Sequence, residues 1–246
     1  MRALTSREIL EVWEKGESQA LQDRAISLLA MVCPGLSRDR LGMLTVSERD
    51  RFLLELRERT FGSTLKGFAL CPGCGERLEF TLAVSDIRQP PAEDSAGKEH
   101  LLELPEADIR LRFRVPNGLD LATVSSCESV QEAKGLLLER CVLEATQYGK
   151  SIKLRGLPSE IIDHLSARLS ELEPQAEVLL DLQCSVCPNR WQMMLDILSY
   201  FWTEISVEAK RLLREVHRLA SAYGWREEDI LSMSQTRRRF YLEILA

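Results

Sequence analysis

The sequence predicts a mixed α+β protein that is predominantly helical, with helical N- and C-terminal regions around a small β region. Apolar residues recur at helical spacing towards both ends of the chain. Two Cys-x-x-Cys pairs, at 71–74 and 184–187, are each followed by residues that alternate between polar and apolar. Ile109–Val115 also alternates strictly, which indicates a half-exposed strand.

These patterns divide the chain into three regions. The central region is expected to hold two zinc-ribbon-like hairpins with a strand and helix segment inserted between them. The expected bounds are 1–62 for the N-terminal helices, 63–195 for the central region, with hairpins at 63–88 and 176–195 and the insertion at 101–175, and 196–246 for the C-terminal helices.

The N-terminal region is expected to hold three helices. Thr5-Ser6-Arg7-Glu8 fits a capping box at the start of the first. The second fits 18–32 and ends before Cys33-Pro34, because proline disfavours the helical conformation in the residue before it. The third is expected to begin near Ser47, where Asp50 completes another capping pattern.

The two cysteine pairs are expected to lie at the tips of hairpins. Extended stretches precede them at 65–70 and 178–182, and apolar residues follow at every second position: Leu78, Phe80 and Leu82 after the first pair, Trp191, Met193 and Leu195 after the second. The second pair is followed by Pro188-Asn189, where glycine is common.

Cys71, Cys74, Cys184 and Cys187 together supply four thiolates, the ligand set of a structural, tetrahedral Zn²⁺ site. The 109 residues between Cys74 and Cys184 exceed the roughly 15–20 of an ordinary ribbon, so the intervening chain must be a folded insertion. Two alternatives remain open: a site that has lost its metal, and a redox dithiol, which needs a helix after the first cysteine.

Within the insertion, 88–100 is rich in proline, glycine and charged residues and is expected to be a loop. The strand at 109–115 carries arginines on one side, as a solvated face or as an anion or partner site. Helical patterns cover 129–146 and 158–172, with a turn at Tyr148-Gly149 between them.

A long amphipathic helix is expected from Asp196 to a C-cap at Gly224, followed by helices at 227–233 and from Ser234 onwards. The last helix has basic and aromatic residues, which are typical of interface anchors. They are candidates for partner docking, with packing against the long helix as the alternative: Arg238, Phe240, Tyr241 and Leu242.

Composition limits the function. The chain has 246 residues, 45% hydrophobic and 28% charged, and a net charge of −6, which repels nucleic acid and anionic lipid. It has no phosphate-binding loop, His-Glu-x-x-His or Gly-x-Ser-x-Gly motif, so we expect no enzyme and no small-molecule substrate. No apolar run approaches the roughly 20 residues of a membrane span and no signal core follows Met1, which predicts a cytoplasmic protein.

Several segments, taken as a set, resemble the baseplate hub assembly chaperone family of contractile phage tails, in the larger form found with phage-tail-like contractile injection systems. They are 4–13, Cys33-Pro34, 57–62, both cysteine pairs with Trp191, 202–205, 212–217, 222–225, 230–231 and 237–242. The resemblance implies a non-enzymatic bacterial protein that binds baseplate, hub or spike proteins and associates with the assembling tail. The alternatives are a zinc-ribbon nucleic-acid-binding or regulatory factor and a thiol redox protein.

Overall fold

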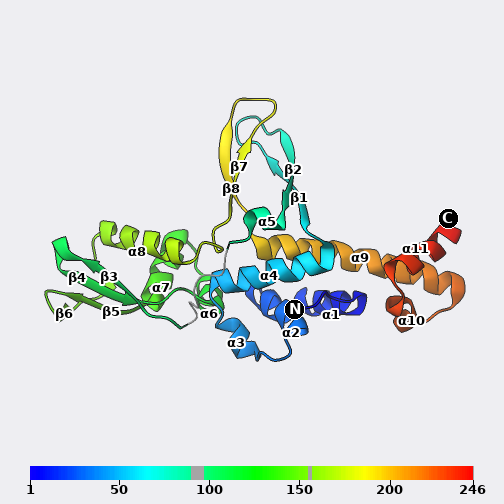
Figure 1. Ribbon diagram of the computed structural model, residues 1–246, viewed down its shortest axis with the longest axis horizontal. Coiled ribbons are helices and arrows are strands. Elements are labelled where there is room, and N and C mark those ends of the chain that lie inside the picture. Colours follow the sequence, from blue (N-terminus) through cyan, green and yellow to red (C-terminus); the bar gives the residue numbers. More distant parts are fainter. Residues whose placement is uncertain (90–96, 155–156, 246) are drawn as a thin grey trace.

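The computed structural model describes residues 1–89, 97–154 and 157–245. Figure 1 shows an elongated molecule in which a layer of helices carries two β-hairpins that project from its middle. A separate strand and helix unit lies at one end of this layer, and two short helices lie at the other. The predicted α+β class with mostly helical structure is confirmed.

The N-terminal helices are α1 (Ser6–Gly16), α2 (Leu21–Val32), α3 (Arg38–Gly42) and α4 (Val46–Phe61). The predicted capping box of α1 is confirmed: the Glu8 N–H donates to the Thr5 hydroxyl at 3.3 Å, and the Thr5 N–H donates to the Glu8 carboxylate at 2.9 Å. Helix α2 ends at Val32, before Cys33-Pro34, as predicted. The sequence patterns missed α3.

Helix α4 begins at Val46, close to the predicted start near Ser47, but the predicted cap formed by Ser47 and Asp50 is wrong. Thr45 is the N-cap, and Glu48 completes the capping box. Ser47 already lies in the helix, and its hydroxyl accepts a hydrogen bond from the Gln175 N–H at 3.2 Å. The sequence contains two capping patterns here, Thr45 with Glu48 and Ser47 with Asp50. The first caps the helix, whereas the Ser47 hydroxyl of the second bonds to a distant segment of the chain.

Two antiparallel hairpins form where the sequence predicted them. The first pairs β1 (Thr64–Leu70) with β2 (Arg77–Ala83), and the second pairs β7 (Leu179–Gln183) with β8 (Arg190–Met194). A short helix, α5 (Val84–Ile87), follows β2. Figure 1 shows the hairpins side by side, with their tips away from the helical layer.

The inserted unit contains a four-stranded sheet in the order β3-β4-β5-β6, covered by helices that close a core separate from the main one. Its elements are β3 (His100–Leu104), the 3₁₀ turn η1 (Pro105–Ala107), β4 (Ile109–Phe113), α6 (Gly118–Val124), α7 (Val130–Cys141), β5 (Val142–Gln147), β6 (Lys150–Ser151) and α8 (Ser159–Leu172).

The predicted helix over 129–146 is wrong in its last five residues, because α7 ends at Cys141 and the chain then pairs as β5 with β4. The predicted turn at Tyr148-Gly149 is present, between β5 and β6, with positive φ at both residues. Of the predicted loop at 88–100, residues 90–96 lie outside the described residues and His100 begins β3.

The row of arginines on β4 is a solvated face held by ion pairs. Arg110 and Arg112 alternate with buried apolar residues, as the pattern predicted. Arg110 pairs with Glu103, and Arg112 pairs with Glu99 and Glu144.

Helix α9 (Ile197–Tyr223) runs from the bases of the hairpins to the C-terminal end of the helical layer (Figure 1). The predicted ends are confirmed: Asp196 caps its N-terminus, and Gly224 ends it in the left-handed conformation at φ 67°. Helices α10 (Glu227–Ser232) and α11 (Gln235–Ile244) then fold back onto its last turns. The main core lies between α9, α1, α2, α4 and the bases of both hairpins.

Polar contacts fix the inserted unit to the helical layer at the start of α4. The Ser47 N–H donates to the buried Glu173 carboxylate at 2.7 Å, where the positive end of the helix dipole favours an anion. Nearby, the Gln89 N–H donates to the Gln175 side chain at 2.8 Å, and Thr45 forms an isolated bridge with Asn117.

Candidate metal centre

The first cysteine pair lies in a tight turn between β1 and β2. The Cys71 N–H donates to the Glu76 carbonyl and the Gly75 N–H donates to the Cys71 carbonyl, both at 2.8 Å. Gly75 has φ 77°, a conformation that residues with a Cβ rarely adopt. The Gly73 N–H points at the Cys71 sulfur from 3.4 Å, so the turn orients its first thiol.

The second pair forms a similar turn without glycine. The Cys184 N–H donates to the Asn189 carbonyl at 3.0 Å, and the N–H groups of Val186 and Cys187 each lie 3.4 Å from the Cys184 sulfur. Asn189 lies near the position where glycine is common, but unlike Gly75 it does not have a positive φ. Its side-chain amide instead lies 3.8 Å from the Cys71 sulfur of the opposite turn.

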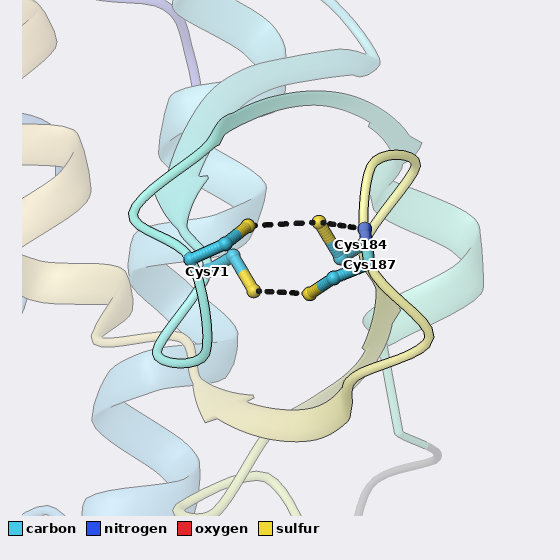
Figure 2. A group of neighbouring side chains, drawn as sticks. Cys71, Cys184 and Cys187 are labelled. Atoms are coloured by element: carbon cyan, nitrogen blue, oxygen red, sulfur yellow. Dashed lines mark hydrogen bonds between the residues drawn. The ribbon is translucent and has the colours of Figure 1, made fainter.

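The two turns bring the four predicted sulfurs together, all within 4.8 Å of one another. The sulfurs of Cys71 and Cys187, and those of Cys74 and Cys184, lie 3.6 Å apart. Figure 2 shows the side chains of the two turns pointing at one another across the gap between the hairpins. These separations exceed the roughly 2 Å of a disulfide bond.

The geometry fits one tetrahedral metal ion. Four sulfurs bound at about 2.3 Å around a tetrahedral centre lie about 3.8 Å from one another, close to the spacing observed. The soft thiolate set suits zinc and other thiophilic ions, and four protein ligands leave no open position for a catalytic water. The donor set therefore supports a closed, structural site.

Without a cation the cluster resists full ionisation. Burial opposes ionisation of the Cys71 thiol, but the Gly73 and Cys74 N–H groups and the neighbouring sulfurs outweigh it and lower its pKa to about 6. The Glu76 N–H favours the Cys74 thiolate, yet the neighbouring sulfurs and burial raise its pKa to about 12. A bound cation would supply the charge that lets all four ionise together.

The surroundings of the sulfurs do not favour a redox dithiol or a nucleic-acid-binding site. Cys71 and Cys184 are buried, whereas Cys74 is exposed at the hairpin tip. The residues after Cys74 form a turn and strand β2, so the helix N-terminus that a redox dithiol requires is absent from this described segment. Arg77 on β2 pairs with Glu79, which leaves little positive charge beside the first turn.

The predicted docking residues of α11 differ in their exposure. Phe240 is 60% exposed, whereas Arg238 is only 2% exposed, and its guanidinium donates to Glu215 at 2.9 Å and to the Met233 carbonyl at 2.6 Å. Tyr241 and Leu242 are half-buried against the small core between α9, α10 and α11. The docking role of these side chains stays a prediction.

Sequence patterns did not find the contact of Asn189 with the opposite turn. A residue two positions after a Cys-x-x-Cys pair carries no signal of its own, and the contact exists only once the hairpins face one another. Gly73 is a further participant: a Cβ there would lie 3.3 Å from Asn189 Cβ. The two turns are thus fitted to each other beyond their four ligands.

Together, the fold and the site define a helical scaffold whose two hairpins, distant in the sequence, bring four cysteines into a cluster that could hold a metal ion. The chain belongs to the T4 bacteriophage base plate protein family, whose model matches residues 3–202. This match includes both cysteine pairs and the inserted unit, and it ends within α9. Comparisons with curated proteins and with solved structures found no match. Among the described residues, no helix is both long and apolar enough to cross a membrane.

Proposed function

We propose that this protein is a non-enzymatic assembly chaperone or adaptor for the baseplate hub of a contractile phage tail or phage-tail-like injection system. Membership of the base plate protein family over residues 3–202 carries the proposal. The partners are baseplate, hub or spike proteins, and the chain acts in the bacterial cytoplasm on the assembling tail particle.

The proposed metal is a structural Zn²⁺ bound by Cys71, Cys74, Cys184 and Cys187. Its support is the closed set of four thiolates within 4.8 Å of one another. The ion would hold the hairpins at a fixed angle on the helical layer. A rigid projecting element of this kind suits a protein that positions other proteins.

Helix α11 is proposed as one docking element. Phe240 offers an exposed aromatic side chain, and Tyr241 and Leu242 lie beside it with part of their surface exposed. Arg238 would support docking indirectly, because its ion pair with Glu215 fixes α11 on α9.

The test is affinity purification of the tagged protein from its native host, with zinc quantified and co-purifying chains identified by mass spectrometry. We expect hub, spike or baseplate chains and about one zinc per chain, the stoichiometry that four thiolates predict. A Cys184→Ser variant provides the matched control for the metal. Zinc together with nucleic acid or transcription proteins, and without tail proteins, would refute the proposal.

A further inference from the structure

A groove opens where the two hairpins stand on α9, between the edges of β1 and β8. Its volume is about 760 Å³. The walls and floor are largely apolar and include Phe61, Phe68, Phe80, Met193, Leu195 and Val207. Two of these side chains are well exposed, Phe68 at 55% and Val207 at 64%.

The groove is built on fixed elements. The Tyr200 hydroxyl donates to the Lys66 carbonyl and accepts from the Lys66 N–H, both at 2.9 Å, which attaches the edge of β1 to α9. Gly67 lies in the same wall, and a Cβ there would lie 2.5 Å from the Phe80 ring. The absence of a side chain at Gly67 therefore leaves room for Phe80.

The acidic residues of the groove are neutralised within the chain. Glu204 receives two hydrogen bonds from Arg57, at 2.6 and 2.8 Å. Glu208 receives two from Arg211. Lys66, in contrast, is exposed at the rim and forms no ion pair with the described residues.

A basic stripe continues from the groove along α9. Lys210, Arg214 and Arg218 are exposed, and among the described residues none has a salt-bridge partner. Their spacing of four places them on the helix face that carries Val207 in the groove. From Val207 to Arg218 the stripe extends about 16 Å along the helix.

This local charge opposes that of the whole chain. Lys66, Lys210, Arg214 and Arg218 supply unpaired positive charge beside an apolar groove, although the net charge of the protein is −6. Surface potentials of this kind select partners of opposite sign. The groove accommodates apolar side chains, and the stripe is complementary to acidic ones.

We infer that the groove and the basic stripe form one docking surface for a partner protein segment that has apolar residues next to acidic residues. The apolar part would bind between β1, β8 and α9, and the acidic part would lie along Lys210, Arg214 and Arg218. The inference rests on the proposed function in one respect: the partner would be a protein of the assembling tail.

The binding test uses fluorescence anisotropy with the full-length, metal-loaded chain. The probe is a labelled twelve-residue peptide with two phenylalanines and a leucine in its first half and four glutamates in its second. We expect saturable binding that weakens with salt and falls roughly tenfold in the Lys210→Glu/Arg214→Glu variant. A Val207→Asp variant should weaken binding through the groove.

The control variant, Lys150→Glu/Lys153→Glu, reverses the same number of charges on the inserted unit and should bind normally. Unchanged metal content and thermal melting of each variant would show that it remains folded. Three results would overturn the inference. They are absence of peptide binding, equal binding of a peptide with lysines in place of the glutamates, and wild-type affinity in the Lys210→Glu/Arg214→Glu variant, called the α9 variant below. Binding of a duplex DNA oligonucleotide in place of the acidic peptide would do so too.

Purification from the native host separates the two proposals. If tail proteins co-purify with the wild-type chain and with the Lys150→Glu/Lys153→Glu variant but not with the α9 variant, both proposals are supported. If they co-purify equally with the α9 variant, the docking surface is wrong and the proposed function stands. If the peptide binds as expected but no tail protein co-purifies with any variant, the docking surface stands and the proposed function fails.

Discussion

Asp120 is the most enclosed carboxylate of the inserted unit. It receives hydrogen bonds from Arg114 at 2.6 and 3.0 Å, from Arg140 at 2.8 Å and from the Asn117 N–H at 3.0 Å. Its side chain is only 1% exposed. Through these contacts one residue of α6 joins the end of β4 to the end of α7.

Removing this charge should destabilise the inserted unit. The Asp120→Asn variant leaves two arginines without their common partner, and we expect a loss of about 3 kcal/mol. Thermal unfolding followed by calorimetry measures the loss. The matched control is Asp163→Asn, which removes an exposed carboxylate paired with Lys134 and should change stability by less than about 1 kcal/mol.

Because of this carboxylate, the difference in stability between the wild type and the Asp120→Asn variant should depend on pH. Burial opposes ionisation, but hydrogen bonds from Arg114, the Asn117 N–H and Arg140 outweigh it and lower the pKa of Asp120 below its usual value. The stabilisation is therefore complete above the unfolded pKa of about 3.9 and is lost as pH falls through the lower folded value. A difference in melting temperature that stayed constant to pH 2 would contradict this assignment.

At the residue scale, the sequence identified the four cysteines because a metal site leaves a spacing signal. Asp120 left none: its partners come from β4 and α7, and only the tertiary fold brings Arg114 and Arg140 to it. Similarly, Arg238 appeared as one of three consecutive arginines, and only its burial against Glu215 separates it from its exposed neighbours.

At the element scale, periodicity predicted α1, α2, α4, the hairpins and α9, since each has one apolar face that packs inward. It missed α3, which has only five residues. It failed at β5, where Val142–Gln147 continues the helical pattern of α7. Pairing of β5 with β4 buries Ala145 and outweighs that local preference. Local helix propensity carries no information about a partner strand that lies about 30 residues away in the sequence.

The crossing of α1 and α9 depends on the absence of a side chain at Gly16. A Cβ there would lie 2.1 Å from the Trp202 ring. Arg24 covers that ring with its guanidinium carbon 4.6 Å from the centroid. We expect Gly16→Ala to cost about 1–3 kcal/mol by displacing Trp202, as measured by urea unfolding with tryptophan fluorescence.

Gly135 provides the control because it is the same substitution in a different setting. It lies within α7 with nothing within 4 Å of its Cβ position. Gly135→Ala should therefore stabilise the protein by about 0.5–1 kcal/mol. Equal effects of the two substitutions would show that contact with Trp202 is not the cause.

Variants of helix α11 can separate residues that pack the helix against α9 from residues proposed to bind a partner. Arg238→Gln breaks a buried ion pair and should detach α11 from α9 at a cost of about 3 kcal/mol, seen as faster amide exchange over 235–244. Arg239→Gln is the control, because Arg239 is 80% exposed. Phe240→Ala should leave the exchange unchanged, and increased exchange in that variant would mean that Phe240 has a packing role.

At the scale of the whole molecule, the candidate metal centre brings together segments that are far apart in the chain. The ligands at 71–74 and 184–187 flank the entire inserted unit, which has its own core and is fixed to the start of α4 by Glu173. The sequence could predict that an insertion exists. It could not predict the polar contacts that orient it, because serine, glutamate and glutamine at those positions are compatible with an ordinary surface.

Loss of one ligand should release both hairpins. We expect Cys184→Ser to lose the metal, to lower stability by at least about 3 kcal/mol, and to increase amide exchange in β1, β2, β7 and β8. Metal analysis and hydrogen exchange on the same sample measure both effects. The inserted unit should keep its protection, because its core is separate.

Cys127→Ser is the control for loss of a thiol, since Cys127 lies outside the cluster. Wild-type metal content and exchange are expected in that variant. Unchanged metal and unchanged hairpin exchange in Cys184→Ser would contradict a structural role for the site. The division of the chain at 62, 101, 175 and 195 stays a prediction that the same exchange data would test.

The separation of the two cysteine pairs also has a consequence for the order of events during synthesis. A ribosome that adds about 5–20 residues each second needs roughly 5–20 s to pass from the first pair to the second. For that time the nascent chain carries two of four ligands, and the core residues of the inserted unit are all made before the second pair. A metal ion at this candidate site would therefore bind its complete set of ligands late, and the two hairpins would become fixed to each other only when most of the chain has been made.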